Sequence, residues 1–278
     1  MNQNDPLVSI VLPVHNGEKY LRESLDSCLK QTYENIEIVV IDDASTDSTS
    51  EILKEYEEKL EKIKVFTIEK QNSLGAVLNI GIQASNGEYI ARMDADDIMY
   101  PTRIEKQVEF LEVNENVVVV GGQIDIIDGE GNITEERRYS LNDRELRKNL
   151  FIYQPFAHPA IMFRKNIVLD FGMYPVDLPK VEDVKLAFLL SQKGDFANLP
   201  EKVLKYRMTF DTESQAKMVD HFKRTNQVRR EVIKELGINP TFREYCIWYL
   251  EIVTVFLTKK IPQKWFMGLL NIARRIFK

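Results

Sequence analysis

Over the first hundred residues, short apolar runs alternate with amphipathic stretches, and this alternation constrains the fold more than any other feature of the sequence. The β-branched runs at residues 7–12 and 36–41 are too short for helices and predict buried parallel strands. Residues 18–30, between them, place their apolar side chains on one helical stripe. The alternation continues with a helix at 48–60, a strand at 63–68, a helix at 75–84 and a strand at 88–93. It predicts an α/β fold with a mainly parallel central sheet flanked by helices, whose ligands gather at the carboxyl ends of the strands.

After residue 102 the pattern becomes mixed. Strands are predicted at 117–120 and 124–127, followed by a Gly-rich turn at 128–132 and a strand at 133–139, which together indicate a hairpin. A strand at 161–163, a helix at 181–192 and a strand at 202–206 follow. Two helix starts carry capping signals, Ser48 with Glu51 and Thr102 with Glu105. No internal repeat or clear linker precedes residue 210, so one compact domain is expected up to that point.

Charge and cysteine content narrow the functions that the chain can have. It carries 37 basic and 43 acidic residues, a net charge of −6, which excludes nucleic acid as the main partner because phosphate-backbone binding needs a basic field. Cys28 and Cys246 form no disulfide framework, and the sequence shows no signal-peptide pattern. We therefore expect a cytoplasmic protein. The charge is divided unevenly, because residues 1–258 carry −12 and the last twenty residues carry +6.

A pair of carboxylates, Asp42 and Asp43, ends the second predicted strand. The Ser, Thr and Asp residues that follow are typical of a turn that caps the next helix. A carboxylate at a strand end can also accept the imide N–H of a uracil or thymine ring, which cytosine and adenine lack. Both interpretations stay open from these residues alone.

Three carboxylates, Asp94, Asp96 and Asp97, follow the fourth predicted strand. Such close negative charges repel one another and need a cation or full hydration. One interpretation is a solvated loop that caps the helix after Thr102. The other is a site for Mg²⁺ or Mn²⁺, ions that take oxygen ligands and are commonly completed by the phosphates of a substrate.

Glu182 and Asp183 lie at the start of a predicted helix, where the helix dipole favours carboxylates. They are either helix caps or, if they face the metal site, the source of a general base. His158 is one of three histidines and is either structural or functional. The sequence lacks a dinucleotide-binding glycine fingerprint, a P-loop, a Cys-x-x-Cys pair and a Gly-x-Ser-x-Gly elbow, which argues against dehydrogenase, P-loop NTPase, structural-zinc and serine-hydrolase functions.

The order of these motifs resembles that of the family 2 inverting glycosyltransferases, which use nucleotide sugars and have the GT-A fold. The resemblance runs from about residue 7 to residue 207. It is carried by VSIVLPVHN at 8–16, QTY at 31–33, VIDDASTD at 40–47, GEYI at 87–90, DADD at 94–97, HP at 158–159 and ED at 182–183. It implies a GT-A catalytic domain at 1–210, with a nucleotide-binding part at 1–100 and an acceptor part at 101–210. A C-terminal helical extension is expected at 211–278.

The resemblance also implies roles for individual residues. The nucleotide-binding residues would be Pro13, His15, Asn16, Asp43 and Asp94. Asp96 would bind Mn²⁺ or Mg²⁺, and Asp183 would be the catalytic base. His158 and Glu182 would contact the acceptor or the phosphates. His15 departs from the family, which more often has tyrosine there, so its stacking on the base is the least supported of these roles.

The implied activity is transfer of a hexosyl or N-acetylhexosaminyl group from a nucleotide sugar, with UDP favoured, to a hydroxyl of a glycan or lipid-linked glycan, with inversion. Bacterial surface or capsular polysaccharide synthesis is the expected setting. An inactive sugar-nucleotide-binding or scaffold protein of the same fold is the main alternative. A nucleotidyltransferase would need a Gly-rich basic loop near the first strand, and the NGEK sequence at 16–19 offers little of that.

The last forty residues pose a separate question. Residues 245–257 are almost wholly apolar but too short to span a bilayer, which needs about 20 residues. Residues 263–277 mix aromatic and aliphatic side chains with basic ones, a composition typical of an interfacial helix on anionic lipid. Either these segments pack on the catalytic domain or a second subunit, or they dock the protein on the inner face of the cell membrane.

Overall fold

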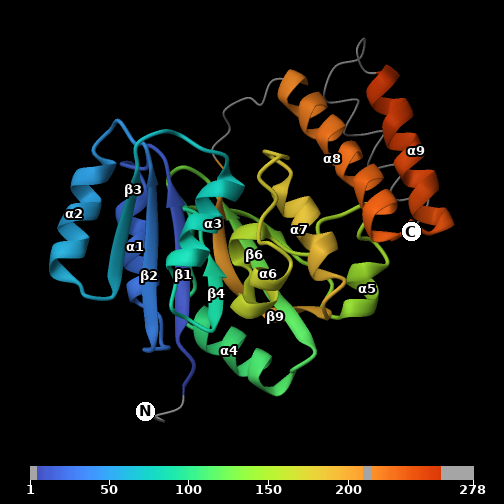
Figure 1. Cartoon of the computed structure of the whole chain (residues 1–278). Coiled ribbons are helices and arrows are strands. Elements are labelled where there is room, and N and C mark those ends of the chain that lie inside the picture. The colour runs from blue at the N-terminus through green and yellow to red at the C-terminus, as the bar shows by residue number, and fades with distance from the viewer. Residues whose placement is uncertain (1–4, 209–214, 258–278) are drawn as a thin grey trace.

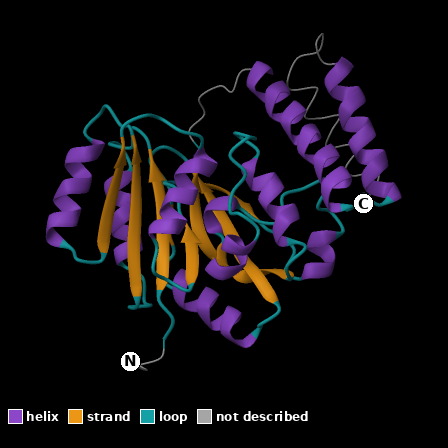
Figure 2. Ribbon diagram, in the orientation of Figure 1, coloured by secondary structure: helices purple, strands orange, loops and turns teal. Residues whose placement is uncertain are grey.

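A computed structural model describes residues 5–208 and 215–257 (Figure 1). Within these residues, a nine-stranded sheet has the order β3-β2-β1-β4-β8-β6-β9-β5, with β7 paired to β6. Helices flank this curled sheet (Figure 2). The strands are β1 Val8–Val14, β2 Ile36–Asp43, β3 Ile63–Ile68, β4 Tyr89–Arg92, β5 Ile98–Met99, β6 Val117–Ile127, β7 Ile133–Arg137, β8 Met162–Arg164 and β9 Asp195–Arg207. The helices are α1 Leu21–Leu29, α2 Thr49–Lys59, α3 Leu74–Ala84, α4 Arg103–Val113, α5 Asp143–Arg147, α6 Lys165–Asp170, α7 Glu182–Leu190, α8 Gln215–Leu236 and α9 Phe242–Leu257, with a 3₁₀ turn at His158–Ala160.

The first half of the sheet is the parallel layer that the sequence predicts. β1 pairs in parallel with β2 on one side and with β4 on the other, and β2 pairs in parallel with β3. Every residue of β1, β2 and β4 is buried, as expected for strands covered on both faces. The chain moves outward from β1 to β3 and then returns to β4 on the far side of β1. The carboxyl ends of β1 and β4 therefore form a topological switch point, where sheets of this kind bind ligands.

The second half of the sheet differs from the predicted pattern in the length of its strands. β6 runs unbroken through Gly121 and Gly122, where the sequence indicates two short strands, and β9 is 13 residues long instead of five. Gly121 lies so close to β9 that a Cβ there would be 2.2 Å from Oδ1 of Asn198. The glycine pair therefore permits close pairing of β6 with β9 and does not interrupt the strand.

The two capping signals do not form as predicted. Ser48 and Thr102 occupy the N-cap positions of α2 and α4, but neither side chain makes a capping hydrogen bond. The Asp47 carboxylate instead accepts the Thr49 N–H at 3.0 Å, and the Glu105 carboxylate accepts the Thr32 hydroxyl at 2.7 Å. A different local bond at α2 and a tertiary bond at α4 therefore replace the capping bonds that the spacing predicts.

α8 and α9 lie side by side and pack on the preceding part of the fold next to α7 (Figure 1). The indole of Trp248 lies 6.3 Å from the Phe151 ring, and the Glu244 carboxylate accepts the Phe151 N–H. Phe242 and Tyr249 of α9 remain exposed. The packing alternative thus describes one face of residues 245–257, whereas the predicted helix at 263–277 lies outside the described residues. None of the helices in the described part of the chain is long and apolar enough to cross a bilayer.

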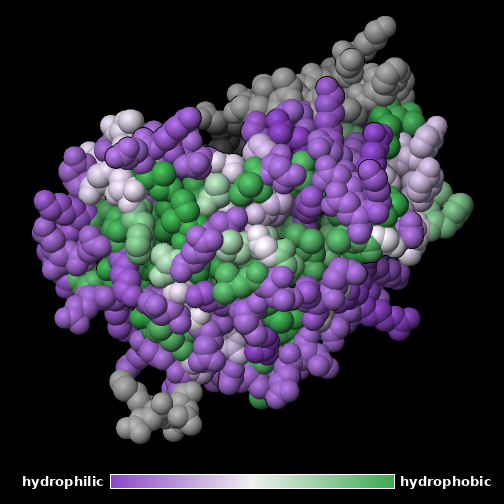
Figure 3. All heavy atoms as spheres, in the orientation of Figure 1, coloured by the Kyte–Doolittle hydropathy of each residue, from purple (hydrophilic) through white to green (hydrophobic). Residues whose placement is uncertain are grey.

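The surface seen in Figure 3 is mostly hydrophilic, with hydrophobic side chains gathered over the middle of the face, where α3 and α6 lie in Figure 1.

β9 ends at Arg207, and α8 begins at Gln215 after residues 209–214, which the structure does not describe. The division of the chain at residue 210 stays a prediction.

Candidate active site

A cavity of about 280 Å³ opens at the carboxyl ends of β1, β2 and β4. Four of the predicted nucleotide-binding residues line it: Pro13, His15, Asp43 and Asp94. Its other walls come from Val14 and from the segment that leads into α3: Gln71, Asn72, Leu74 and Val77. Asn16 is not among the lining residues. Residues 30 to 80 positions apart thus meet at the switch point because the parallel strands end there together.

His15 and Asn16 join the loop after β1 to the loop after β2. His15 Nδ1 donates to the backbone carbonyl of Asp43 at 2.7 Å, which assigns its proton to Nδ1. The Asn16 side chain donates to His15 Nε2 at 3.2 Å and accepts the Thr46 N–H at 2.8 Å. Asn16 has a φ of 53°, a left-handed conformation that asparagine tolerates better than most residues. Its amide therefore orients the imidazole from outside the cavity.

The two acids at the end of β2, Asp42 and Asp43, have different surroundings and different hydrogen-bond partners. Asp42 is a turn residue, since its carboxylate accepts the Ser45 N–H at 3.1 Å and the Ser50 hydroxyl at 2.7 Å. Asp43 faces the cavity, and its Oδ1 accepts the Asn72 N–H at 2.9 Å. The backbone amide thereby fixes the Asp43 carboxylate in the cavity wall.

A buried arginine, which the sequence analysis missed, forms an ion pair with the first carboxylate of the cluster. The two terminal nitrogens of the Arg92 guanidinium contact the two carboxylate oxygens of Asp94 at 2.7 and 2.6 Å. The Arg92 side chain is only 4% exposed. The neighbouring carboxylates keep the pKa of Arg92 raised despite its burial. Residues two apart in an extended strand share a face, so the spacing of Arg92 and Asp94 was the available signal.

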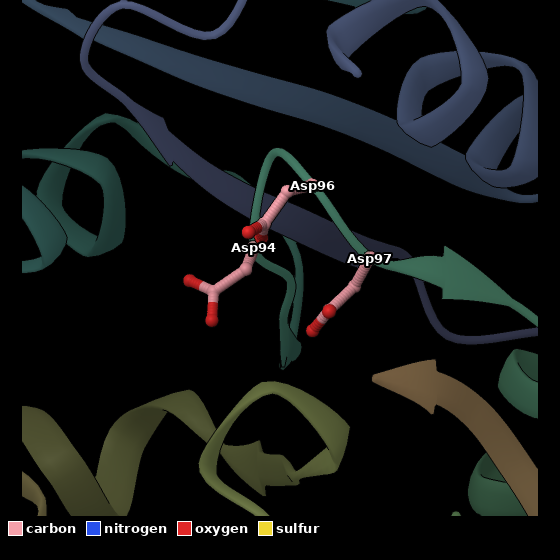
Figure 4. Close-up of side chains that lie close together, drawn as sticks. All are labelled: Asp94, Asp96 and Asp97. Atoms are coloured by element: carbon pink, nitrogen blue, oxygen red, sulfur yellow. The ribbon is translucent and has the colours of Figure 1, made fainter. Parts of the chain in front are cut away.

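Asp94, Asp96 and Asp97 come from the one loop between β4 and β5, and Asp96 is directed toward Asp94 (Figure 4). One ligand oxygen from each lies within 4.8 Å of the others. Loss of hydration and then the charge of Asp94 raise the pKa of Asp96 to about 6, although the residue as a whole is exposed. Burial, with the charges of Asp94 and Asp96, raises the pKa of Asp97 well above its usual value.

The Asp97 carboxylate gives a direct test of whether the cluster suits a metal ion. It is 1% exposed, and its Oδ1 accepts the Arg207 N–H at 2.8 Å. Its Oδ2 is buried without a hydrogen-bond partner among the described residues. An orphaned buried oxygen beside two further carboxylates is a set of hard oxygen donors, which suits Mg²⁺ or Mn²⁺.

Glu182 and Asp183 begin α7 but lie in different surroundings. Asp183 Oδ1 accepts the Val184 N–H at 2.8 Å, and Oδ2 accepts a bond from the Gln154 side chain at 3.2 Å. Burial raises the pKa of Asp183, and the charges of His221 on α8 and of Arg92 partly offset this rise. A carboxylate with a raised pKa is suited to accept a proton near neutral pH.

Glu182 is buried more deeply than Asp183. It is 4% exposed, burial raises its pKa, and its Oε2 has no hydrogen-bond partner within the described ranges. A Cβ on Gly75 of α3 would lie 3.5 Å from the Glu182 Cβ, so the side chain starts against that helix. Glu182 therefore sits between α7 and α3, whereas Asp183 points toward Gln154.

His158 begins the 3₁₀ turn and bonds through Nε2 to the Tyr174 hydroxyl at 2.8 Å. Burial, followed by the charge of Arg92, lowers the pKa of His158 well below its usual value, so it is neutral at pH 7. Tyr174 is 2% exposed, and the charges of Arg92 and Asp183 act on it. The charge of Arg92 thus acts on the pKa values of Asp96 and Asp97 in the carboxylate cluster. It also acts on those of His158 and Asp183, so the predicted sites lie in one region.

Comparison with known proteins agrees with this arrangement. A family model described as Glycosyl transferase family 2 matches residues 9–171. An uncharacterized glycosyltransferase of Haemophilus influenzae is 34% identical over 242 residues, which cover 83% of this chain and 74% of the relative. The chain therefore belongs to glycosyltransferase family 2.

Solved structures share the fold. The structure of S. aureus TarS 1-349 in complex with UDP-GlcNAc has a TM-score of 0.67 and 19% identity, and the match covers 98% of this chain and 80% of the TarS 1-349 chain. The mannosyltransferase PcManGT from Pyrobaculum calidifontis, in complex with GDP-Man and Mn²⁺, has a TM-score of 0.60 and 16% identity, covering 98% and 74%. The prediction of a GT-A fold is confirmed.

Proposed function

We propose that this chain transfers a hexosyl or N-acetylhexosaminyl group from a UDP-sugar to an acceptor hydroxyl, with inversion and with the help of Mn²⁺ or Mg²⁺. The observation that carries the proposal is the meeting of the cavity and the Asp94, Asp96 and Asp97 cluster at the switch point of the sheet. Two structural neighbours support it, since one is a complex with UDP-GlcNAc and the other a complex with a nucleotide sugar and Mn²⁺.

Nucleotide recognition is assigned to the cavity. Asp43 accepts the imide N–H of uracil, a donor that cytosine and adenine lack. His15 lies on the exposed side of the same cavity and offers a ring for the base. Asp94 reaches the ribose side, because Arg92 holds its carboxylate at the cavity edge. Pro13 closes the floor, and Asn16 acts through His15.

Asp96 is the direct metal ligand in this proposal, with Asp94 and Asp97 beside it. A divalent cation bound there supplies Lewis-acid chemistry, which neutralises charge on the departing nucleoside diphosphate. The chain's own contribution is to hold three carboxylates together against their repulsion, through the Arg92 guanidinium and the Arg207 N–H.

Asp183 acts as the general base. It takes the proton of the acceptor hydroxyl while that oxygen bonds to the anomeric carbon from the face opposite the diphosphate. The bond between the anomeric carbon and the diphosphate oxygen breaks in the same step, and the configuration inverts. Gln154 orients the carboxylate through its bond to Oδ2. Positioned proton transfer of this kind contributes about 10²- to 10⁴-fold in rate.

Glu182 and His158 support the acceptor side of the site. His158 is neutral and bonded to Tyr174, so it offers a dipole at the phosphate region without adding charge. Glu182 is buried next to Asp183 in the chain, and its Oε2, which has no hydrogen-bond partner in the described part of the chain, is assigned the contact to the acceptor or the phosphates. Both roles rest on the resemblance to the family together with these contacts.

The setting that we propose is bacterial surface or capsular polysaccharide synthesis at the inner face of the membrane. The acceptor is a glycan or lipid-linked glycan. The basic residues among the last twenty residues of the sequence supply the attraction to anionic lipid. The aromatic side chains Phe242 and Tyr249, exposed on α9, lie on the helix that precedes this basic segment.

A thermal-shift screen of UDP-, GDP- and dTDP-sugars, each with and without Mn²⁺, tests the donor. A ligand that binds only the folded state raises the melting temperature, by an amount that grows with its concentration relative to its Kd. We expect the largest shift with a UDP-sugar plus Mn²⁺. A larger shift with GDP-sugars would contradict the assignment of Asp43 to uracil, and an absence of shifts with every donor would overturn the proposed function.

A further inference from the structure

A second and larger cavity, of about 680 Å³, lies between β7, α5 and α9. Four cationic side chains line it, and Glu145 is its single acidic residue. We call it the basic pocket, after these four residues: Arg137, Arg138, Lys148 and Arg243. This concentration of positive charge stands out in a chain with a net charge of −6.

Buried polar side chains fix the walls of the basic pocket. The Asn198 amide, 2% exposed, donates to the backbone carbonyls of Ser140 and Pro155, each at 2.9 Å. Gln123, also buried, accepts the Tyr139 N–H at 2.6 Å. The segments that carry the lining residues are thus tied to β9 and β6 independently of any ligand. A pocket that is formed in advance loses less free energy to ordering when it binds.

Two cations of the basic pocket, Arg138 and Lys148, are only weakly neutralised by the protein. Lys148 lies 3.8 Å from the Glu145 carboxylate, and Arg138 lies 3.2 Å from Glu136, with the side chains of both pairs well exposed. Exposed ion pairs of this kind contribute little to stability. Arg243 donates to the Asn149 side chain at 2.8 Å, which holds it at the pocket wall. The pocket therefore keeps a net positive charge, and a doubly charged anion is the ligand chemistry that it fits best.

One residue, Gln154, links the basic pocket to the proposed catalytic base. Gln154 lines the pocket, and its amide also donates to Oδ2 of Asp183 at 3.2 Å. A molecule held in the pocket therefore lies next to the residue whose amide touches Asp183. The cavity that Asp43 and Asp94 line, where the nucleotide is placed, shares no lining residue with the basic pocket. The two cavities can hold two different substrates at once.

We propose that the basic pocket is the acceptor site and that the acceptor carries a phosphate group near the hydroxyl that Asp183 deprotonates. This inference rests on the proposed function, because it takes Asp183 as the base. Two kinds of acceptor have such a phosphate: a soluble phosphorylated sugar or glycan, and a sugar attached to a lipid through phosphate. Arg243 belongs to α9, so the helical extension contributes directly to acceptor binding.

Calorimetry on the full chain tests the proposal with glucose 6-phosphate as the soluble probe and glucose as its uncharged match. Short-chain phosphatidic acid, kept monomeric below its micelle concentration, provides the lipid arm and offers no membrane surface to the basic segment at 259–278. The variant is Arg138→Ala with Lys148→Ala, two exposed side chains whose loss leaves the core intact. Arg144→Ala is the control, since Arg144 is an exposed cation of the same helix α5 that does not line the pocket.

We expect the wild type to bind glucose 6-phosphate or the monomeric phosphatidic acid, and glucose at least tenfold more weakly. The double variant should bind the same phosphate probe at least tenfold more weakly than the wild type, because each lost cation removes a charge-assisted contact. Arg144→Ala should bind like the wild type. Equal binding by the double variant and the wild type, or no binding to either phosphate probe, overturns the proposal.

Hydrolysis of a UDP-sugar by the wild type in the presence of Mn²⁺ separates this proposal from the proposed function. If phosphate binding depends on the pocket and no donor is hydrolysed, the catalytic assignment fails and the anion site stands. If donors are hydrolysed and phosphate binding does not depend on the pocket, the acceptor inference fails alone.

Discussion

Replacement of Arg92 by methionine tests the idea that one buried cation holds the carboxylate cluster together. The methionine keeps much of the side-chain volume but removes the two bonds to Asp94. Removing one partner of a buried pair costs about 3–5 kcal/mol. Because Asp94 is 27% exposed, we expect the lower end of this range, about 3 kcal/mol. For a chain of this size, that loss lowers the melting temperature by about 6 °C.

The loss of unfolding free energy in Arg92→Met should also depend on pH. Arg92 lowers the pKa of Asp96 and of Asp97, so its removal raises both values further. An acid whose pKa is higher in the folded than in the unfolded state costs stability as pH rises through that range. The deficit of Arg92→Met is therefore largest at pH 8 and smaller at pH 5, where these carboxyl groups take up protons.

Urea denaturation without divalent cations, at pH 8 and pH 5, measures both effects. The second substitution Asp94→Asn, added to Arg92→Met, should recover part of the loss, since it removes the carboxylate left without its partner. Arg138→Met is the control, because an exposed arginine away from the cluster should change the unfolding free energy by less than about 0.5 kcal/mol. A change of less than about 0.5 kcal/mol in Arg92→Met itself at pH 8 refutes the reasoning.

Three further predictions follow from the same structure. The rise in melting temperature with Mn²⁺ should be larger at pH 7.5 than at pH 5. The pKa of Asp96 is raised to about 6, so protons compete with the cation for the carboxylate below that pH. Equal shifts at both pH values would contradict a carboxylate site. Gly121→Ala should destabilise the protein by about 1–3 kcal/mol in urea denaturation, since a Cβ there would be 2.2 Å from Oδ1 of Asn198, and unchanged stability would show that β6 and β9 are not so closely paired. In flotation with anionic liposomes, a chain that ends at Leu257 should bind less than the full chain, and equal binding would refute a membrane role for the basic segment; this end point keeps α9, whose Trp248 packs near Phe151.

The parallel half of the fold could be predicted because its signals are local. β1, β2 and β4 are short apolar runs that fit only buried strands, and their polar ends had to meet once the sheet was parallel. The cavity accordingly joins Pro13 and His15 with Asp43 and Asp94. Where a polar residue directly follows a strand of this layer, its place in the site can be predicted from the sequence.

The remaining features depend on contacts between distant segments, which periodicity does not encode. Gln154 precedes Asp183 by 29 positions, and nothing in its neighbourhood marks it as a partner of that carboxylate. The role of Tyr174 beside His158 has no local signal either. Gly121 was taken as a break in a strand, although it serves the close approach of β9. In each case the tertiary contact decides and the local propensity does not.

Kinetics and nucleotide binding of Asp183→Asn test the central claim most directly, since the substitution keeps the shape of the side chain and removes its capacity to take a proton. We predict that transfer, or donor hydrolysis, falls at least about 100-fold while the calorimetric Kd for UDP with Mn²⁺ stays within about twofold of the wild type. Turnover close to that of the wild type would remove Asp183 from the role of base and contradict the account.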